Sequence, residues 1–532
     1  MKRAARLHPL LYAGYPILAL LSVNLGQVRA ADAVRPVVVS VVGAVVLLLA
    51  FRLLTGEWRQ SAILVSGVLI IFFSYGHVYT ILKTWRIGDF VVGRHRYLAP
   101  VALLLFVWWL WWGSRKRRAV AQLEAFFVVV GIAGLALPSI SIARNWLTIS
   151  GSTWEASLAG AESAYALEPR DAGAGPDIYY IIVDAYARAD VLQDFYDYDN
   201  SEFLDFLTAQ GFYVATESTS NYHMTDLSMA SSLNLEYLDD LAVEMGRSPE
   251  SRMPLAEMID HSRVRAALAR VGYRFVAFDT GVPYTSLEDA DVFISPRLPS
   301  FLPRRLTEFE VMVLRTTAFR AVLDGYLQSQ ENPANPNAAL AELHRQRVLL
   351  TLETLPEIPR WQGRYFVYAH VAIPHPPFVF GSEGEARTVE GDFSLLDGSD
   401  FAGSGEEYID GYLAQLEWLS DRLREIIPRI IEDSETPPVI ILQGDHGPRS
   451  HTVWENSEET NMREGMGILN AYYMPEGGAG LLYPTITPVN TFRVLFDEYF
   501  GANLELLDDD SYFLFEFDPF LFDKVTDRVH TD

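Results

Sequence analysis

The sequence contains no cysteine. This absence excludes disulfide bonds, zinc sites built on thiolates and a cysteine nucleophile. It does not identify the compartment, because a chain of 532 residues can bury a full core without disulfide bonds on either side of a membrane.

Acidic residues are scarce at the start of the chain, and basic residues are scarce afterwards. Residues 1–150 hold 16 Lys and Arg against 4 Asp and Glu, whereas the remainder holds 26 against 64. Nucleic acid is therefore not an expected partner, since phosphate contacts need clustered basic residues and no dense cluster follows residue 118. An anionic substrate of the acidic region would require a cation.

Long apolar runs are confined to the N-terminal region. A membrane helix needs about 20 mostly apolar residues, and only short basic loops separate the runs, so we expect a transmembrane domain over residues 1–150 rather than buried core helices. The five predicted spans cover residues 10–25, 37–51, 61–82, 97–112 and 120–140.

Basic residues indicate the orientation of these spans. Three precede the first span, and the cluster Arg115-Lys116-Arg117-Arg118 follows the fourth, which places both on the cytoplasmic side. An odd number of spans then places everything after residue 141 outside. Against this topology, Lys83, Arg86, Arg94 and Arg96 fall in a loop that it makes external.

Residues 151–175 have the composition of a linker, and a second domain is predicted over residues 176–532. Strand and helix patterns alternate there, which indicates an α/β sheet whose ligands bind beyond the carboxyl ends of the strands. The predicted strands are residues 178–183, 275–278, 365–369 and 439–442, and the clearest helices are residues 201–210 and 412–431.

Potential metal ligands end three of these strands. Asp184 follows the first, His370 the third, and Asp445 with His446 the fourth. Alone, an Asp-His-Gly sequence is typical of a turn and an Asp after a strand is typical of a helix cap. Their convergence on one sheet edge predicts a metal site instead.

Thr225 stands where a helical pattern begins. One interpretation is a plain helix cap. The other is a nucleophile, because a helix N-terminus favours an incoming phosphoryl or sulfuryl group and a neighbouring cation would ionise the hydroxyl.

The order of these motifs resembles the alkaline phosphatase superfamily over about residues 176–500. The resemblance rests on Asp184, Thr225, the stretch from His370 to His375-x-Pro, and Asp445-His446-Gly447. Within this superfamily, the chain is similar in particular to membrane-anchored sulfatase-like proteins, including lipoteichoic acid synthases and phosphoethanolamine transferases. These place an external catalytic domain after five spans.

The resemblance implies that Asp184, Thr225, Asp445 and His446 hold one divalent metal, and that His375, with His370, handles the substrate or leaving group. Mn, Mg and Zn all suit this mixture of ligands, and a second ion stays open. The chain departs from the family pattern in carrying Asp184 where those transferases usually carry Glu. It also lacks the Cys/Ser-x-Pro-x-Arg motif from which sulfatases form formylglycine, so that chemistry is not expected.

Other polar residues near the motifs are weaker candidates. Arg449 and Arg463 could bind a phosphate oxygen, since a guanidinium suits that geometry. His223 and His451 could be further ligands or surface residues. His375 has the alternative of a rigid Pro-flanked turn.

The function predicted from the sequence is a metal-dependent transferase that moves a phosphorylated head group through a Thr225 ester intermediate. Its partners would be a membrane lipid donor and an envelope glycan or lipid acceptor. We expect it in the bacterial inner membrane, with the catalytic domain periplasmic or extracellular. The alternatives are a sulfatase-like hydrolase of phosphate or sulfate esters and a non-catalytic protein of envelope assembly or transport.

Overall fold

The computed structural model divides the chain into two compact units. Unit 1 comprises Met1–Gly151 and Pro299–Pro336, and unit 2 comprises Ser152–Leu298 and Asn337–Asp532. The structure describes residues 4–25, 28, 30–83, 85–87, 90–115, 122–150, 167, 175–245, 252–282, 284–296, 307–328, 338–389, 393–395, 401, 403–453, 456–515 and 518–530. The predicted linker at residues 151–175 lies almost wholly outside them.

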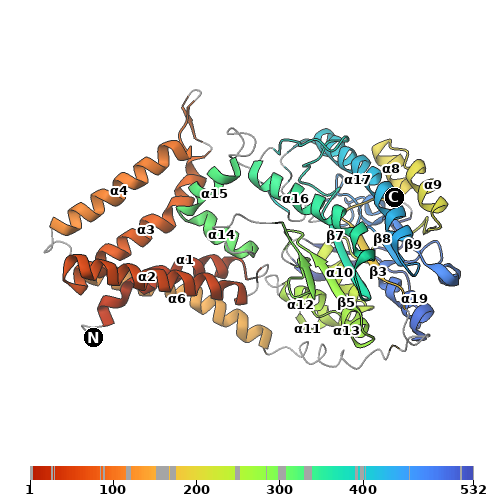
Figure 1. The fold of residues 1–532 in the computed structure, drawn as a ribbon, viewed down its shortest axis with the longest axis horizontal. Coiled ribbons are helices and arrows are strands. Elements are labelled where there is room, and N and C mark those ends of the chain that lie inside the picture. Colours follow the sequence, from red (N-terminus) through yellow and green to blue (C-terminus); the bar gives the residue numbers. More distant parts are fainter. Residues whose placement is uncertain are drawn as a thin grey trace. The chain divides into compact units, whose positions relative to one another are not determined.

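Five apolar helices form most of unit 1, one for each predicted span (Figure 1). Four of them are long and apolar enough to cross a membrane, and α1, with 16 residues, is shorter. The helices are α1 (His8–Val23), α2 (Val34–Thr55), α3 (Trp58–Leu82), α4 (His95–Arg115) and α6 (Glu124–Ser150), and the short elements are η1 (Ala4–Leu7), η2 (Ala30–Ala33), β1 (Arg86–Ile87) and β2 (Phe90–Val91).

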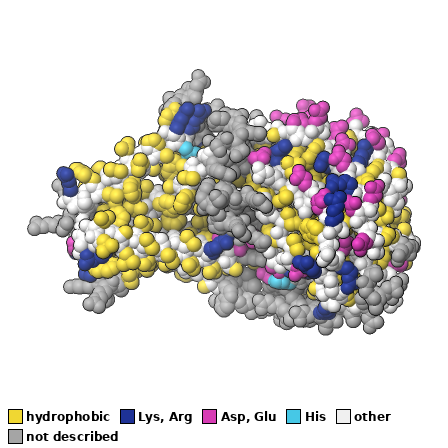
Figure 2. Space-filling model, in the orientation of Figure 1, with side chains coloured by type: hydrophobic (Ala, Val, Ile, Leu, Met, Phe, Trp, Pro, Cys, Tyr) yellow, Lys and Arg dark blue, Asp and Glu magenta, His cyan; other side chains and the backbone are white. Residues whose placement is uncertain are grey.

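Large apolar side chains cover the outside of this unit. Leu53 at the end of α2 is 87% exposed and Leu104 in the middle of α4 is 68% exposed. Figure 2 shows the same apolar surface over these helices, whereas charged side chains dot the surface of unit 2. Contiguous apolar surface of this extent suits lipid rather than water.

Polar contacts show which helix ends lie together. Arg59, near the start of α3, forms an ion pair with Glu124, the first residue of α6, at 2.5 Å. Gln60 donates a hydrogen bond from Nε2 to the carbonyl of Gly113 in the last turn of α4, at 2.8 Å. One end of unit 1 therefore contains the start of α3, the end of α4 and the start of α6. Arg115, the first residue of the basic cluster, lies at this same end.

A pair of helices from later in the chain completes unit 1. They are α14 (Glu308–Thr316) and α15 (Phe319–Gln328). Phe309 and Val313 of α14 are buried in one apolar core with residues of α1, α2 and α3. The boundaries predicted from the sequence, at residues 150 and 176, do not include this return of the chain to the membrane unit.

Unit 2 is built on a seven-stranded sheet of order β4-β9-β8-β3-β7-β5-β6. All four predicted strands are present, and the predicted α/β fold is confirmed. The strands β8, β3, β7, β5 and β6 run parallel to one another, whereas β9 runs antiparallel to both β8 and β4. The strands are β3 (Ile178–Val183), β4 (Tyr213–Val214), β5 (Arg274–Phe278), β6 (Val292–Ile294), β7 (Tyr365–Val371), β8 (Val439–Gln443) and β9 (Asn470–Tyr473).

Helices surround this sheet (Figure 1). The predicted helix at 201–210 is α9, which Gly211 follows with a left-handed φ of +95°, and the helix predicted at 412–431 lies within a longer α17. The helices are α8 (Ala189–Tyr196), α9 (Ser201–Ala209), α10 (Thr225–Asn234), α11 (Asp239–Met245), α12 (Met253–Asp260), α13 (Arg263–Arg270), α16 (Ala338–Thr354), α17 (Gly405–Asp433), α18 (Met462–Met466) and α19 (Pro488–Phe500), with η3 (Leu355–Arg360), η4 (Pro475–Leu481) and a hairpin of β10 (Tyr512–Phe515) and β11 (Asp518–Lys524).

The strand register aligns the predicted ligands. Ile182 on the central strand β3 lies level with His370 on β7 and with Gln443 on β8. Asp184 and Asp445 each lie two residues further on, where their parallel strands have ended. The sheet thus delivers these side chains to one edge at nearly the same height.

Candidate active site

The turn after β3 joins the two predicted aspartates. Asp184 follows the last residue of the strand, and Ala185 adopts a left-handed backbone conformation with a φ of +62°. A residue with a Cβ pays roughly 1–2 kcal/mol for this conformation, so it is found where the surroundings enforce it. Here it accompanies a hydrogen bond of 3.1 Å from the Ala185 N–H to Oδ1 of Asp445.

Two histidines approach Asp184 from β7 and the loop that follows it. His370 Nε2 lies 3.4 Å from Oδ2 of Asp184. The backbone N–H of His375 donates to the carbonyl of Asp184 at 3.1 Å. Both histidines are buried.

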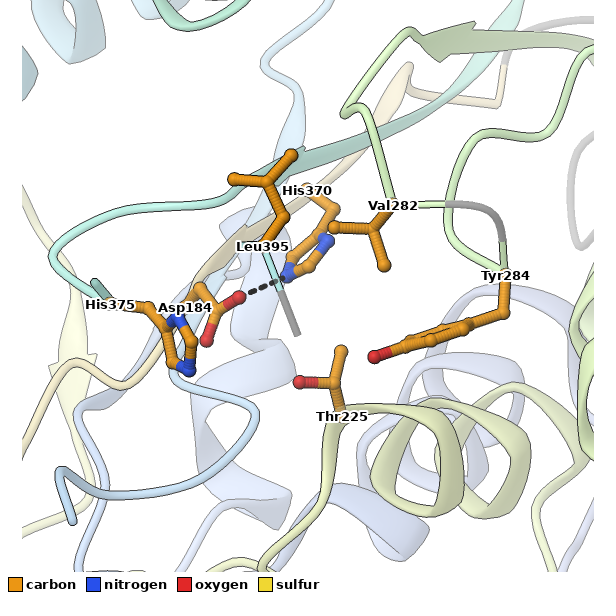
Figure 3. A pocket seen from close by; sticks show the side chains of 7 residues that line it. All are labelled: Asp184, Thr225, Val282, Tyr284, His370, His375 and Leu395. Carbon is orange, nitrogen blue, oxygen red and sulfur yellow. Dashed lines mark ion pairs between the residues drawn. The ribbon is translucent and has the colours of Figure 1, made fainter. Parts of the chain in front are cut away.

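Thr225 is the first residue of α10 and faces this cluster. Met224 occupies the cap position of the helix without a side-chain hydrogen bond, so the Thr225 hydroxyl is not engaged as a helix cap. Its Oγ1 lies 3.3 Å from Nε2 of His446. Figure 3 shows the hydroxyl turned toward Asp184 and His375.

Backbone carbonyls fix the orientation of two imidazoles. His446 has Nδ1 at 2.7 Å from the carbonyl of Gly447, and His375 has Nδ1 at 2.5 Å from the carbonyl of Pro376. An Nδ1–H that donates to these carbonyls leaves each Nε2 with a free lone pair. His446 directs that lone pair at Asp184, whose Oδ1 is 3.4 Å away, and at Asp445, whose Oδ2 is 3.6 Å away.

The buried charges of the cluster oppose one another. Burial disfavours the ionised form of Asp184, but His375, His370 and His446 outweigh it and lower the pKa of that carboxyl below its usual range. Burial, with the neighbouring charge of Asp184, raises the pKa of Asp445 to about 6. Two carboxylates in one buried site therefore need a positive partner for both to be ionised.

The cluster fits a divalent metal. Two groups of three residues each bring one ligand atom within 4.8 Å of the others, namely Asp184 with His375 and His446, and Asp184 with His370 and Asp445. Among the described residues, Asp184 Oδ1, Asp445 Oδ2 and both ring nitrogens of His370 have no hydrogen-bond partner, although all four atoms are buried. Such atoms are costly in a protein interior unless a ligand engages them, and oxygen with imidazole donors suits Mn, Mg or Zn.

A small pocket borders the site. Asp184, Thr225, His370 and His375 are part of its lining. Val282, Tyr284 and Leu395, which the sequence analysis did not single out, complete the lining, and Figure 3 shows the Tyr284 hydroxyl pointing toward Thr225. Val282 and Tyr284 follow β5. Because ligands of an α/β sheet bind beyond the carboxyl ends of its strands, the sequence could have identified this loop as part of the site.

The two predicted phosphate-binding arginines lie in different places. Arg449 is buried and donates to the carbonyl of His223 at 2.6 Å, and its positive charge adds to burial in lowering the pKa of His446. Arg463 forms ion pairs with Asp190 and Asp194 on α8, and it is not among the described residues that line the pocket. The structure therefore brings Arg449, but not Arg463, close to the metal cluster.

His223 and His451 are separate from the two metal-ligand groups. His223 is buried and stacks on Phe513 with ring centroids 4.4 Å apart. His451 is half exposed and pairs with Glu464 at 3.3 Å. Each ring is thus engaged with a residue outside the cluster.

By sequence, no protein-family model and no curated protein matches the chain. Solved structures do resemble it. Lipooligosaccharide phosphoethanolamine transferase A from Neisseria meningitidis is 12% identical, and the alignment covers 93% of this chain and 95% of that one with a TM-score of 0.35.

Two further similar structures match about two thirds of the chain. The C-terminal periplasmic domain of phosphoethanolamine transferase EptC from Campylobacter jejuni is 11% identical over 64% of this chain and 95% of that one, with a TM-score of 0.37. Phosphonate monoester hydrolase of Agrobacterium radiobacter is 13% identical over 64% and 80%, also with a TM-score of 0.37. At these identities and TM-scores the likeness is distant.

Proposed function

We propose that this protein is a metal-dependent enzyme that transfers a phosphorylated head group through an ester on Thr225. The observation that carries the proposal is the Thr225 hydroxyl at the start of α10, 3.3 Å from His446 and facing a cluster of buried, unpartnered ligand atoms. A hydroxyl in such a place combines three requirements of a nucleophile: an ionising neighbour, a helix N-terminus and a pocket for the substrate.

The residues divide the reaction between them. Asp184, Asp445, His446 and Thr225 would hold the metal, which when bound lowers the pKa of the hydroxyl and offsets the charge of an anionic substrate. Thr225 loses its proton to Nε2 of His375, which the contact of Nδ1 with the Pro376 carbonyl leaves with a lone pair. The Thr225 Oγ1 bonds to phosphorus, the bond from phosphorus to the leaving oxygen breaks, and His375 passes the proton to that oxygen.

A second displacement frees the enzyme. An acceptor hydroxyl or water attacks phosphorus and the bond to Thr225 Oγ1 breaks. His375 takes up the proton of the attacking group and returns it to Oγ1 of Thr225. An acceptor on an envelope glycan or lipid makes the enzyme a transferase, and water makes it a hydrolase. The covalent link to lipid-facing helices favours a lipid donor and hence transfer.

Mass spectrometry tests the intermediate. The purified full chain, incubated with a bacterial membrane lipid extract, should gain a covalent adduct on the peptide that contains Thr225, and the added mass names the transferred group. Thr225→Ala should gain none. An adduct that persists in Thr225→Ala, or one mapped to another residue, contradicts the proposal.

We further propose that unit 2 lies outside the cytoplasm, at the outer face of the bacterial inner membrane. The support is the shared helix end next to Arg115, where the basic cluster begins, because basic loops are retained in the cytoplasm. The opposite end carries the β1–β2 hairpin, so the basic residues in that loop lie at the outer surface in this topology.

Reporter fusions check this topology. Alkaline phosphatase fused after Asp532 should be active and green fluorescent protein at that point should be dark, because the first folds only outside the cytoplasm and the second only inside. Insertion of either reporter after Arg115 should give the reverse pattern. The same pattern at both positions would contradict the topology.

A further inference from the structure

The helices α14 and α15 reach far along a membrane span. The N–H of Ala318, in the turn between them, donates to the carbonyl of Phe72 at 2.9 Å, and the rings of Phe319 and Phe72 meet edge to face at 5.5 Å. Phe72 lies ten residues before Leu82, the end of α3, which corresponds to about 15 Å along the helix. The turn therefore lies about halfway along a helix that is long enough to cross the bilayer.

A glycine allows this close approach. A Cβ on Gly76 of α3 would lie 2.0 Å from the carbonyl oxygen of Arg315, so only glycine admits the end of α14 there. Small residues at helix contacts are a common means of packing inside membranes. By contrast, a Cβ on Gly43 of α2 would meet nothing within 4 Å.

Ion pairs anchor the hairpin at the outer helix ends. Glu310, in the first turn of α14, forms a two-pronged ion pair with Arg35 near the start of α2. On α15, Asp324 accepts from Nε2 of His95, the first residue of α4, at 2.8 Å. The two helices thus begin and end at the outer end of unit 1, and the turn between them lies deeper.

Polar side chains on the inward face of α15 contact α3. The Arg320 guanidinium lies 4.3 Å over the ring of Tyr79 and donates to Oγ1 of Thr80 at 3.0 Å. His95 stacks on Tyr79 at 4.1 Å. Arg320, Asp324 and His95 form one connected cluster near the end of α3 and the start of α4, so these ionisable groups have protein partners.

The outward face of α15 is apolar. Phe319 and Val322, three residues apart and so on one helix face, are 54% and 53% exposed. Phe319 continues the lipid-facing surface of α3 through its contact with Phe72. Exposed aromatic and aliphatic side chains beside a span face acyl chains rather than water.

We propose that residues 308–328 form a re-entrant hairpin that enters the outer leaflet from the extracytoplasmic side, with Phe319 and Val322 in contact with lipid acyl chains. The proposal goes beyond the catalytic function and rests only on the proposed membrane location and orientation of unit 1. It assigns to a segment between β6 and β7 of unit 2 the role of a membrane element.

The absence of cysteine makes the test direct, because a single introduced thiol is labelled alone. Phe319→Cys and Val322→Cys, labelled with bimane in the full chain in phospholipid nanodiscs, should be quenched by nitroxide-labelled phospholipid as strongly as Leu104→Cys on α4. Val243→Cys on α11, at an 84% exposed position of unit 2, should not be quenched. A membrane-impermeant maleimide should label position 243 and fail to label positions 319 and 322.

The outcomes separate this proposal from the one on function. Quenching at 104 with none at 319 and 322 overturns the hairpin alone, whereas no quenching at 104 overturns the membrane location of unit 1 as well. In the Phe319→Cys protein, Gly76→Leu should displace the hairpin and abolish the lipid quenching, and Gly43→Leu should leave it unchanged. Equal quenching in both would overturn the docked position of α14 on α3.

Discussion

Thr225→Ala is expected to lose nearly all turnover while the protein stays folded. Removal of a nucleophile that forms a covalent intermediate lowers kcat by on the order of a thousandfold or more. The cost in folding is small, because Met224 occupies the cap position and the lost hydroxyl hydrogen bond is worth about 1 kcal/mol. Thr225→Ser should retain part of the activity, since it keeps the hydroxyl. Release of the leaving group from a generic phosphodiester, measured beside thermal unfolding, checks all three proteins.

Ser228→Ala is the matched control for this prediction. It deletes a hydroxyl from the same buried helix, three residues further on, and this Oγ has no hydrogen-bond partner within the described part of the chain. Its turnover should stay close to that of the wild type, so a loss confined to Thr225→Ala cannot come from general damage to α10. Near-normal turnover in Thr225→Ala would refute the role of Thr225 as nucleophile.

The double substitution Asp445→Asn with His446→Gln is expected to abolish metal binding. Both residues are fully buried, and both replacements keep the volume of the side chain while removing a charged oxygen and an imidazole nitrogen from the site. Elemental analysis should find about one divalent ion per wild-type chain and far less in the variant. The variant should also lose turnover together with the ion.

Thermal unfolding gives a second measure of the same site. A metal present at about 100 times its Kd stabilises the folded state by about 2.7 kcal/mol, so a chelator should lower the Tm of the wild type by several degrees. The chelator should not change the Tm of the Asp445→Asn, His446→Gln protein. Asp289→Asn with His261→Gln, two exposed residues of the same unit, should respond like the wild type. An unchanged metal content in the first variant would show that this site is wrongly assigned.

The sequence predicted the parts of the site that depend on local pattern and parallel topology. Asp184, His370 and Asp445 follow or end strands that read as continuous apolar runs, and parallel strands bring their carboxyl ends together whatever their order. Thr225 could be placed at a helix start from the periodicity after it. Four strands, two helices and the apolar spans were predictable for the same reason.

What the sequence did not predict depends on contacts between distant segments. β4 and β9 are short and pair antiparallel at one side of the sheet, and β6 has three residues, so none of them leaves a strong periodic signal. The ion pairs of Arg463 with α8 depend on the tertiary fold. The helices of the hairpin are short and carry charges, and only the complementary residues of α2, α3 and α4 show that they belong to unit 1.

The return of the chain to unit 1 has a consequence for the order of biosynthesis. The five apolar helices leave the ribosome first, but α14, which completes their core, follows about 150 residues later, an interval of roughly 8–30 s at about 5–20 residues per second. In the meantime β3 has been made and its neighbours β7 and β8 have not, because both follow the hairpin in the chain.

Neither unit can therefore finish folding before the other has been partly synthesised. The core of the membrane bundle is incomplete until α14, which is synthesised after β3, has been made. In the central sheet, β3 cannot pair with β7 until residues 299–336, which belong to unit 1, have been synthesised. A truncated protein that begins at Ser152 would carry Phe309 and Val313 without the helices that bury them. Such a fragment would expose an apolar surface to water and would aggregate unless residues 299–336 were replaced by a short polar connection.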